Sequence, residues 1–143
     1  MLEVTCQPFC VFNYRAVLDH ETGLVWQRDP SANTPAYWAP ALDACYSVTL
    51  GGRSGWRPAT LPELMTLFEF QANPELSLPA GHPFQNVASA PLFWTATQYP
   101  DSTTQAYAVN FVDQYAGNSA GKLPFPKNAV NARAWCVRGA DTQ

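Results

Sequence analysis

The sequence predicts an α+β fold, in which two helices pack on small antiparallel sheets with long loops between the elements. Its 143 residues suit one domain, and we expect residues 1–143 to form a single unit. Strand-like and helix-like segments do not alternate regularly, as a parallel sheet would require. Aromatic residues make up 13% of the chain and charged residues only 13%, a balance that excludes disorder and favours a real core.

A β-hairpin is expected near the start of the chain. Residues 14–18 and 24–27 are strand-like and are separated by the polar residues 19–23. Asp19 can accept hydrogen bonds from the backbone of the turn that it begins, and Gly23 can supply the positive φ that the turn needs at its end.

A first helix is expected to begin at Thr34, which suits the N-cap, with Pro35 at the first helical position. Apolar residues recur at spacings of three and four and predict one buried stripe, formed by Trp38, Leu42, Cys45 and Tyr46. Gly51 and Gly52 are expected to end this element.

A second helix is expected to begin at Thr60. Thr60 and Glu63 have the spacing of a capping box, in which each side chain binds the backbone N–H of the other residue. Glu63 is therefore interpreted as a structural group rather than a catalytic carboxylate. The apolar face of this helix is expected to comprise Leu64, Leu67 and Phe68.

The C-terminal half predicts three strands, at residues 93–99, 106–112 and 132–138. Residue types alternate with period 2 in residues 107–112 and 133–138, as in half-buried strands, and residues 93–99 are also strand-like. Residues 73–91 are rich in proline, and residues 113–131 contain two glycines and two prolines. Both segments are expected to be irregular loops.

The chain has four cysteines, which allow three disulfide pairings. We favour Cys6–Cys10, which lie close in the sequence, together with Cys45–Cys136. Four reduced, buried thiols are the alternative, but the even number and the low charge favour an oxidising compartment. The chain has no CxxC pair and only two histidines, so no metal site is predicted.

Charge and hydropathy argue against two classes of partner. The net charge is −3 and the pI about 5.2, whereas proteins that bind nucleic acid are usually basic. Residues 76–100 carry no charged side chain, but four prolines interrupt them, so no membrane-spanning helix is predicted. The first ten residues lack the basic and apolar regions of a signal peptide, and none is expected.

The sequence shows no convincing catalytic constellation, so we expect neither an enzyme nor a cofactor. Ser119 and Lys122 have the S-x-x-K spacing but lack the further motifs of that chemistry. Binding residues are expected around the loops of the C-terminal third, where tyrosines can stack on a ligand and a locally basic segment can attract an anionic polymer. The basic residues could equally form a solvated face. The candidate ligand-binding residues are Tyr99, Asp101, Tyr115, Asn118, Lys122, Lys127 and Arg133.

Several segments, taken in order, resemble one protein family. The first is the motif D-x-x-T-G-L-V-W at residues 19–26, and the second is W-x-x-A-x-x-x-C at residues 38–45. The core segment at residues 51–64 contains G-G-x-x-G-W-R-P, and residues 93–97 and 135–138 read F-W-T-A-T and W-C-V-R. Together these matches span residues 19–138 and resemble the C-terminal domain family of collagen-like adhesins, Lcl C.

This resemblance implies a C-type-lectin-like fold and a disulfide between Cys45 and Cys136, which ties the first helix to the last strand. Members of the family are bacterial surface, secreted or lipid-anchored modules, and the namesake adhesin binds sulfated glycosaminoglycans and assembles as a trimer. We therefore expect an extracellular, cell-surface or periplasmic bacterial module that binds a glycan or host surface polymer without catalysis. The alternative is a protein–protein interaction or assembly module of a surface appendage, phage or secretion system, with a homotrimer as one form.

The chain departs from proteins of the same broad fold at two kinds of site. It lacks the E-P-N, Q-P-D and W-N-D motifs with which calcium-dependent lectins hold calcium and sugar hydroxyls. Asn131 stands where formylglycine-generating enzymes have a second cysteine for copper. We therefore expect neither calcium-dependent sugar binding nor oxidase activity.

Overall fold

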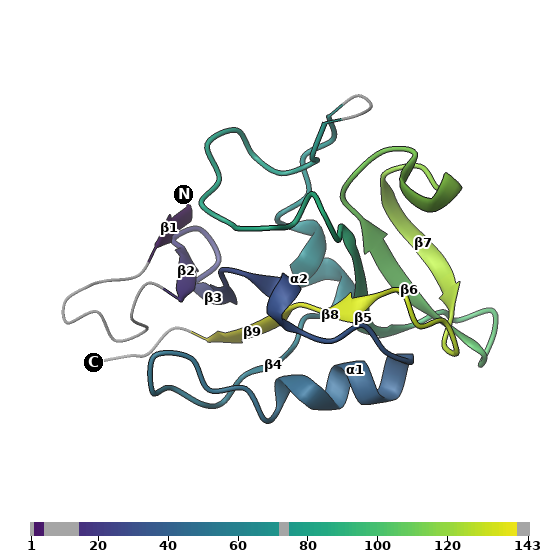
Figure 1. Ribbon diagram of the computed structural model, residues 1–143, viewed down its shortest axis with the longest axis horizontal. Coiled ribbons are helices and arrows are strands. Elements are labelled where there is room, and N and C mark those ends of the chain that lie inside the picture. The colour runs from purple at the N-terminus through teal and green to yellow at the C-terminus, as the bar shows by residue number, and fades with distance from the viewer. Residues whose placement is uncertain (1, 5–14, 72–74, 140–143) are drawn as a thin grey trace.

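The computed structural model describes residues 2–4, 15–71 and 75–139, and all structural statements below concern these ranges. The helices are α1 (Trp38–Cys45) and α2 (Leu61–Met65), with 3₁₀ turns η1 (Pro30–Ala32) and η2 (Tyr115–Gly117). The strands are β1 (Leu2–Val4), β2 (Ala16–Asp19), β3 (Leu24–Gln27), β4 (Arg57–Pro58), β5 (Leu92–Gln98), β6 (Gln105–Asn110), β7 (Gly121–Pro126), β8 (Arg133–Ala134) and β9 (Cys136–Gly139). The predicted α+β class is confirmed (Figure 1).

The strands form two sheets, one of five strands in the order β1-β2-β3-β9-β4 and one of four in the order β7-β6-β5-β8. All pairs are antiparallel except β5 with β8. The chain crosses between the sheets at Trp135, which lies between β8 and β9. The prediction of one unbroken strand over residues 132–138 is therefore wrong. The indole N–H of Trp135 donates to the Gln27 carbonyl at 2.8 Å, and this long-range bond holds the crossing point.

The core has two parts, one toward α1 and one toward α2. Trp56 and Trp94 are buried in the part that contains Cys45 of α1. Trp26 and Trp135 are buried in the part that contains Leu64 of α2. Trp38, predicted to be a core residue, is only half-buried at the start of α1.

An aromatic cluster attaches the proline-rich segment to the sheets. The ring of Trp135 has its centroid 4.8 Å from that of Phe93, 4.9 Å from that of Phe84 and 5.7 Å from that of Phe111. Phe84 belongs to the irregular residues 75–91, so its ring anchors a segment that has no helix or strand of its own. The rings of Phe84 and Phe111 meet Trp135 edge-on, and edge-to-face pairs stabilise a core beyond the area that they bury.

The first hairpin is confirmed in residues 15–28. β2 pairs with β3, and the N–H of Gly23, at a φ of +76°, donates to the Asp19 carbonyl at 2.8 Å. The Asp19 carboxylate accepts from the N–H of Glu21 and the hydroxyl of Thr22, both at 3.0 Å. Tyr14, at the predicted start of the hairpin, lies outside the described residues.

The first helix is shorter than predicted. It begins at Trp38 rather than Thr34 and ends at Cys45, well before the two glycines. The N–H groups of Ala36 and Trp38 donate to the carbonyls of Ala132 and Lys127, and these distant bonds hold the preceding segment away from a helical path. The buried stripe is formed by Ala41 and Cys45, whereas Tyr46, predicted to belong to it, is 66% exposed.

The second helix confirms the capping box. The Thr60 hydroxyl accepts from the Glu63 N–H at 3.4 Å, and the Glu63 carboxylate accepts from the Thr60 N–H at 3.0 Å. The same carboxylate pairs with both terminal nitrogens of Arg57, at 2.8 and 2.7 Å. Glu63 is thus a structural residue, as predicted, and Leu64 and Leu67 are buried while Phe68 is half-buried.

The prediction of a loop over residues 113–131 is wrong, because β7 lies within it. β7 pairs with β6 along its whole length despite Pro124 and Pro126. Proline lacks an N–H, so both ring nitrogens must point away from β6, and a sheet edge tolerates this arrangement. The carbonyl of Tyr107, opposite Pro124, accordingly faces β5 and accepts from the Thr95 hydroxyl at 2.8 Å.

The disulfide between Cys45 and Cys136 is confirmed and joins α1 to β9, with both residues fully buried. Cys6 and Cys10 lie outside the described residues. A buried disulfide is compatible with an extracellular protein. Within the described ranges, no helix has the length and apolar character needed to cross a membrane.

Candidate functional site

Two tyrosines and a lysine lie together on one face of the four-stranded sheet. Tyr99 follows β5, and its ring packs edge-on against Tyr107 of β6 with centroids 5.3 Å apart. The ammonium of Lys122 in β7 lies 5.6 Å from the centre of the Tyr107 ring. Pro124 pairs with Tyr107 across β6 and β7 and is exposed. We call these four residues the tyrosine–lysine face.

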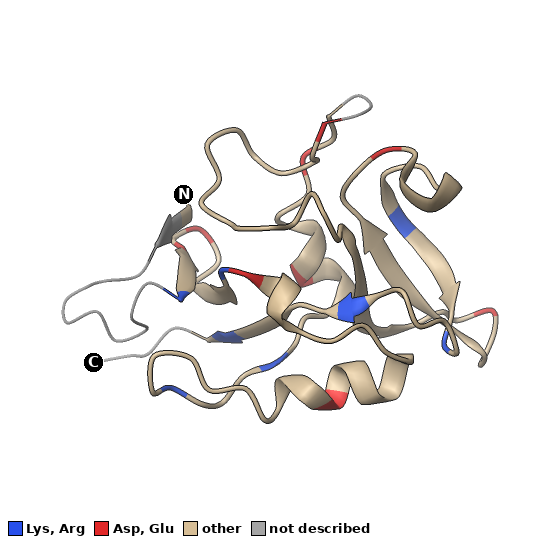
Figure 2. Ribbon diagram, viewed as in Figure 1, with Lys and Arg blue, Asp and Glu red and all other residues tan. Residues whose placement is uncertain are grey.

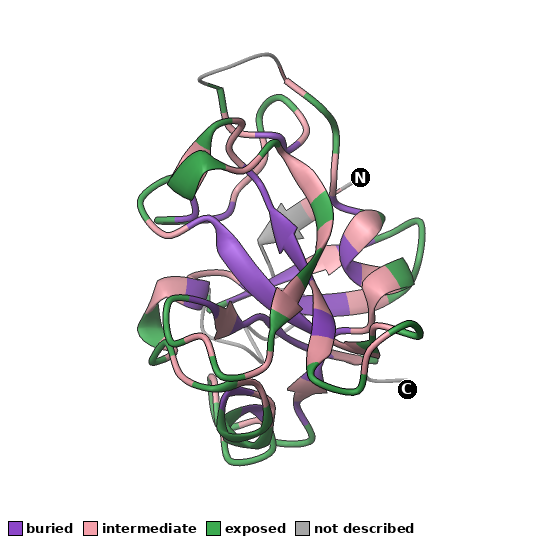
Figure 3. Cartoon of the chain, turned by 90° about the vertical axis from the view of Figure 1, so that its right-hand side faces the viewer, coloured by how far each residue is buried: buried purple, intermediate pink, exposed green. Residues whose placement is uncertain are grey.

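Polar groups of the tyrosine–lysine face are available to a ligand. Neither tyrosine hydroxyl has a hydrogen-bond partner in the described part of the chain, and Lys122 has no carboxylate within ion-pair distance there. Figure 3 shows β7 with alternating exposed and intermediate residues beside the buried strands of its sheet. Asp101, exposed in the turn between β5 and β6, follows Tyr99 closely in the chain.

Lys127 has partners within the chain. Its ammonium donates to the Gln98 side-chain oxygen and the Thr103 carbonyl, both at 2.8 Å, and lies 4.5 Å from the centre of the Trp38 ring. These contacts hold the turn of the β5–β6 hairpin against the start of α1. Lys127, which was predicted from the sequence to bind a ligand, therefore has a structural role in the fold.

Arg133 is not brought together with Lys122. It lies in β8, at the opposite edge of the sheet from β7, and its Nε donates to the Asn33 carbonyl at 2.9 Å. Figure 2 shows basic residues spread over several elements, so the locally basic sequence does not become one basic surface.

Tyr115 and Asn118 lie in a loop that is held from within. The buried Asn110 side chain donates to the carbonyls of Asn118 and Ser119, both at 3.3 Å. Tyr115 packs against the core on the α1 side of the sheet. Tyr107 alternates with small residues that face that side, so Tyr115 and the tyrosine–lysine face lie on opposite sides of the sheet.

Asp101 and Asp113, two aspartates near the ends of β6, do not form a carboxylate pair. Asp101 precedes β6, whereas Asp113 follows it and accepts from the Ala120 N–H at 3.2 Å. No cluster of three or more His, Cys, Asp or Glu side chains within the described ranges could hold a metal ion.

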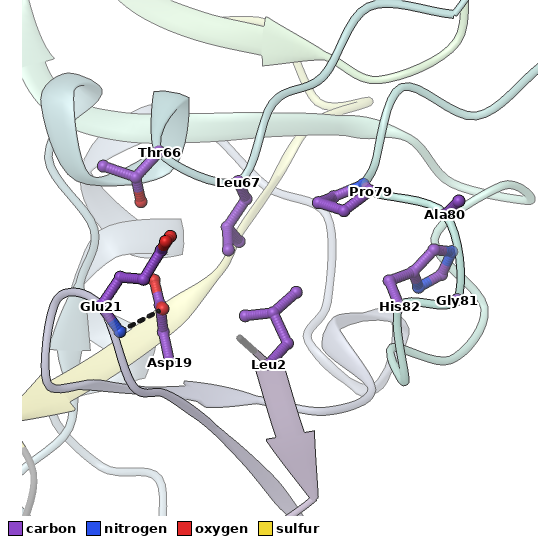
Figure 4. A pocket seen from close by; sticks show the side chains of 9 residues that line it. All are labelled: Leu2, Asp19, Glu21, Thr66, Leu67, Pro79, Ala80, Gly81 and His82. Atoms are coloured by element: carbon purple, nitrogen blue, oxygen red, sulfur yellow. Dashed lines mark hydrogen bonds between the residues drawn. The ribbon is translucent and has the colours of Figure 1, made fainter.

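A hollow of about 410 Å³ lies on another part of the molecule. The lining combines two carboxylates, an imidazole and apolar side chains from four separate segments (Figure 4). We call it the acidic hollow, and its lining residues are Leu2, Asp19, Glu21, Thr66, Leu67, Pro79, Ala80, Gly81 and His82. Sequence reasoning missed this site, because its lining comes from four segments that are far apart in the chain and nothing local indicates that they meet.

The ionisable groups of the acidic hollow have different surroundings. Asp19 is only 5% exposed, and its two hydrogen-bond donors are the uncharged groups of its own turn. Burial lowers the pKa of His82 from its ordinary value, so the imidazole is neutral at pH 7. Its Nδ1 accepts from the Phe84 N–H at 3.2 Å, which leaves Nε2 as the donor.

A comparison with protein families bears on this geometry. The family model described as the Lcl C-terminal domain matches residues 15–138. The chain belongs to the Lcl C-terminal domain family. The resemblance seen over residues 19–138 is thereby confirmed, and the family is one of surface or adhesin-like proteins.

Comparison with curated proteins and with solved structures found no match for this Lcl C-terminal domain. The α+β architecture is shown by the structure itself, with two helices and two sheets in the described residues. Its C-type-lectin-like character stays a prediction from the family resemblance.

Proposed function

We propose that this Lcl C-terminal domain is a non-catalytic binding module of a bacterial surface protein, which recognises a glycan or host surface polymer through its tyrosine–lysine face. The observation that carries the proposal is the Tyr99–Tyr107 ring pair at 5.3 Å with the Lys122 ammonium beside it. Family membership supports the surface-protein part of the proposal.

The chemistry of the face suits a sugar polymer. Tyrosine rings offer flat apolar area for the C–H groups of a sugar, and their hydroxyl groups can donate to or accept from sugar hydroxyls. The Lys122 ammonium adds a point charge for a carboxylate or sulfate substituent. A single exposed cation gives a weak preference for charge, consistent with the net charge of −3.

Binding of an extended peptide as an added strand beside β7 is less suitable than binding of a ligand to the sheet face. At the free edge of β7, the outward-facing positions are Lys122, Pro124 and Pro126, so the two prolines offer carbonyls without N–H donors. An added strand would lack the alternating donors and acceptors that it needs. Recognition through side chains on the sheet face is therefore favoured over strand addition.

The first test is a glycan array that includes heparin and other sulfated polymers, read with calcium and again with a chelator. We expect saturable binding that survives the chelator. Loss of one stacking ring should weaken binding about tenfold, so Tyr107→Ala is the principal variant. Tyr46→Ala is its matched control, because that tyrosine is 66% exposed at the far end of α1.

The contribution of charge is tested separately. Lys122→Gln should weaken binding of sulfated or carboxylated glycans and leave neutral glycans unchanged. Arg15→Gln, which removes an exposed charge near the start of β2, is its control. Binding that is insensitive to both Tyr107→Ala and Lys122→Gln, or the absence of binding to every glycan, would contradict the proposal.

A further inference from the structure

The acidic hollow carries two carboxylates, and the described residues that line it include no lysine or arginine. Asp19 and Glu21 lie on one side, and the neutral His82 lies on the other. Neither carboxylate has an ion-pair partner in the described residues. Asp19 is 5% exposed, and in the described residues its carboxylate accepts only from the uncharged Glu21 N–H and Thr22 hydroxyl, so no cation offsets its charge there. The hollow therefore favours a positively charged occupant.

The walls of the hollow are apolar. Leu2, Leu67 and Pro79 lie between the carboxylates and the loop that carries His82 (Figure 4). Apolar walls that lead to carboxylates match a long side chain with methylene groups and a charged end. An inorganic cation would need several oxygen ligands at close range, and no group of three metal-binding side chains occurs in the described ranges.

The hollow opens to solvent at its rim. Glu21, Ala80 and Gly81 are exposed, whereas Leu67 is buried at the inner wall. A side chain can therefore enter from outside while its own backbone stays at the surface. The volume of about 410 Å³ accommodates a lysine or arginine side chain together with part of its backbone.

We propose that the acidic hollow is a docking site for a lysine or arginine side chain of a protein partner. The carboxylates of Asp19 and Glu21 hold the cationic end, the apolar walls cover the methylene groups, and His82 Nε2 remains free to donate to a backbone carbonyl at the rim. This site shares no residue with the tyrosine–lysine face and goes beyond the glycan binding proposed above.

The test uses the full chain and a pair of short peptides. Acetyl-Gly-Lys-Gly-amide and its norleucine counterpart have side chains of similar length, but only the first is charged. Amide chemical shifts are followed by NMR during titration of each peptide. We expect the lysine peptide to shift signals of residues 19–21, 66–67 and 79–82 in a saturable manner, and the norleucine peptide to bind at least about fivefold more weakly.

Glu21→Gln is the principal variant. The Glu21 side chain is exposed, and in the described residues the hydrogen bond of Glu21 is made by its backbone N–H and not by its carboxylate. The variant should weaken binding of the lysine peptide about fivefold. Glu69→Gln, which removes an exposed carboxylate outside the hollow, should leave binding unchanged. Asp19→Asn provides a second variant with a buried position, and its folding is checked from the same spectra.

The inference would be overturned by equal binding of the norleucine peptide, by shifts confined to residues outside the hollow, by binding that Glu21→Gln leaves unchanged, or by displacement of the peptide by stoichiometric calcium. Tighter binding of pentylammonium than of the peptide would also overturn it, because the hollow would then be a site for a free amine. Tyr107→Ala should leave peptide binding unchanged, so failure of this inference and failure of the glycan proposal are separable.

Discussion

Removal of the Cys45–Cys136 disulfide should destabilise the fold strongly. The two cysteines are separated by 91 positions, so the bond restricts a large part of the unfolded chain. The chain-entropy relation gives about 4.6 kcal/mol at 25 °C for a loop of this length. A domain of this size has a total stability of roughly 5–15 kcal/mol, so the double variant Cys45→Ala/Cys136→Ala should retain only part of it.

The assay is equilibrium unfolding in urea at pH 7, followed by tryptophan fluorescence. Trp56 and Trp94 lie in the same part of the core as the disulfide, so their emission reports on its loss. With a dependence of about 2 kcal/mol per molar urea, the midpoint should fall by about 2 M. Reduction of the unsubstituted chain should lower the midpoint as well, which separates loss of the bond from the effect of the alanines.

A destabilisation of less than about 1.5 kcal/mol would refute this reasoning. It would mean that the unfolded chain is already compact enough for the cross-link to remove little entropy. An unchanged midpoint in the reduced chain, together with a lower one in the double variant, would instead assign the effect to packing around the alanines.

Three further predictions concern local features of the fold. The Arg57 side chain lowers the pKa of Glu63 from 4.5 to about 2, so this carboxylate stabilises the fold above pH 4.5 and loses that effect as the pH falls through 2. Glu63→Gln should therefore cost about 1 kcal/mol at pH 7, after allowance for partial exposure, and little below pH 2, as measured by urea unfolding at both values. The double variant Pro124→Val/Pro126→Val should restore N–H donors to the edge of β7 and cause concentration-dependent self-association in sedimentation velocity, whereas an unchanged monomer fraction would contradict the edge argument. Ala116 has a φ of +53°, so Ala116→Gly should raise the free energy of unfolding by up to about 1 kcal/mol. The control Ala44→Gly, inside α1, should lower it by about 1 kcal/mol. A loss of stability in both variants would argue against strain at Ala116.

The sequence by itself determined the features whose partners lie within a few residues. The Asp19 turn and the Thr60–Glu63 capping box each satisfy their hydrogen bonds locally, so residue type and spacing are enough to predict them. The strands around residues 93–99 and 106–112 were also predicted, the second of them from residue types that alternate with period 2. Cysteine pairing and the family motifs predicted the Cys45–Cys136 bridge.

The candidate site was predictable only in part. Tyr99 and Lys122 were expected at the site and do lie on one face, but their central neighbour Tyr107 was interpreted only as a strand residue. Lys127 was expected to be available to a ligand, yet Trp38 and the β5–β6 turn surround its ammonium. Sequence proximity could not reveal this, since Trp38 lies far from Lys127 in the chain.

Only the tertiary structure decided the remaining features, and in each the partners are distant in sequence. α1 begins at Trp38 because the carbonyls of residues 132 and 127 accept from the N–H groups of Ala36 and Trp38. The strand at β7 exists despite two prolines because β6 supplies its ladder and the sheet edge accepts their orientation. The acidic hollow arises where β1, the Asp19 turn, the end of α2 and the proline-rich segment meet. Hydrogen bonds and packing between distant segments override local preference, because a buried backbone group is stabilised by whichever partner the complete fold brings within reach.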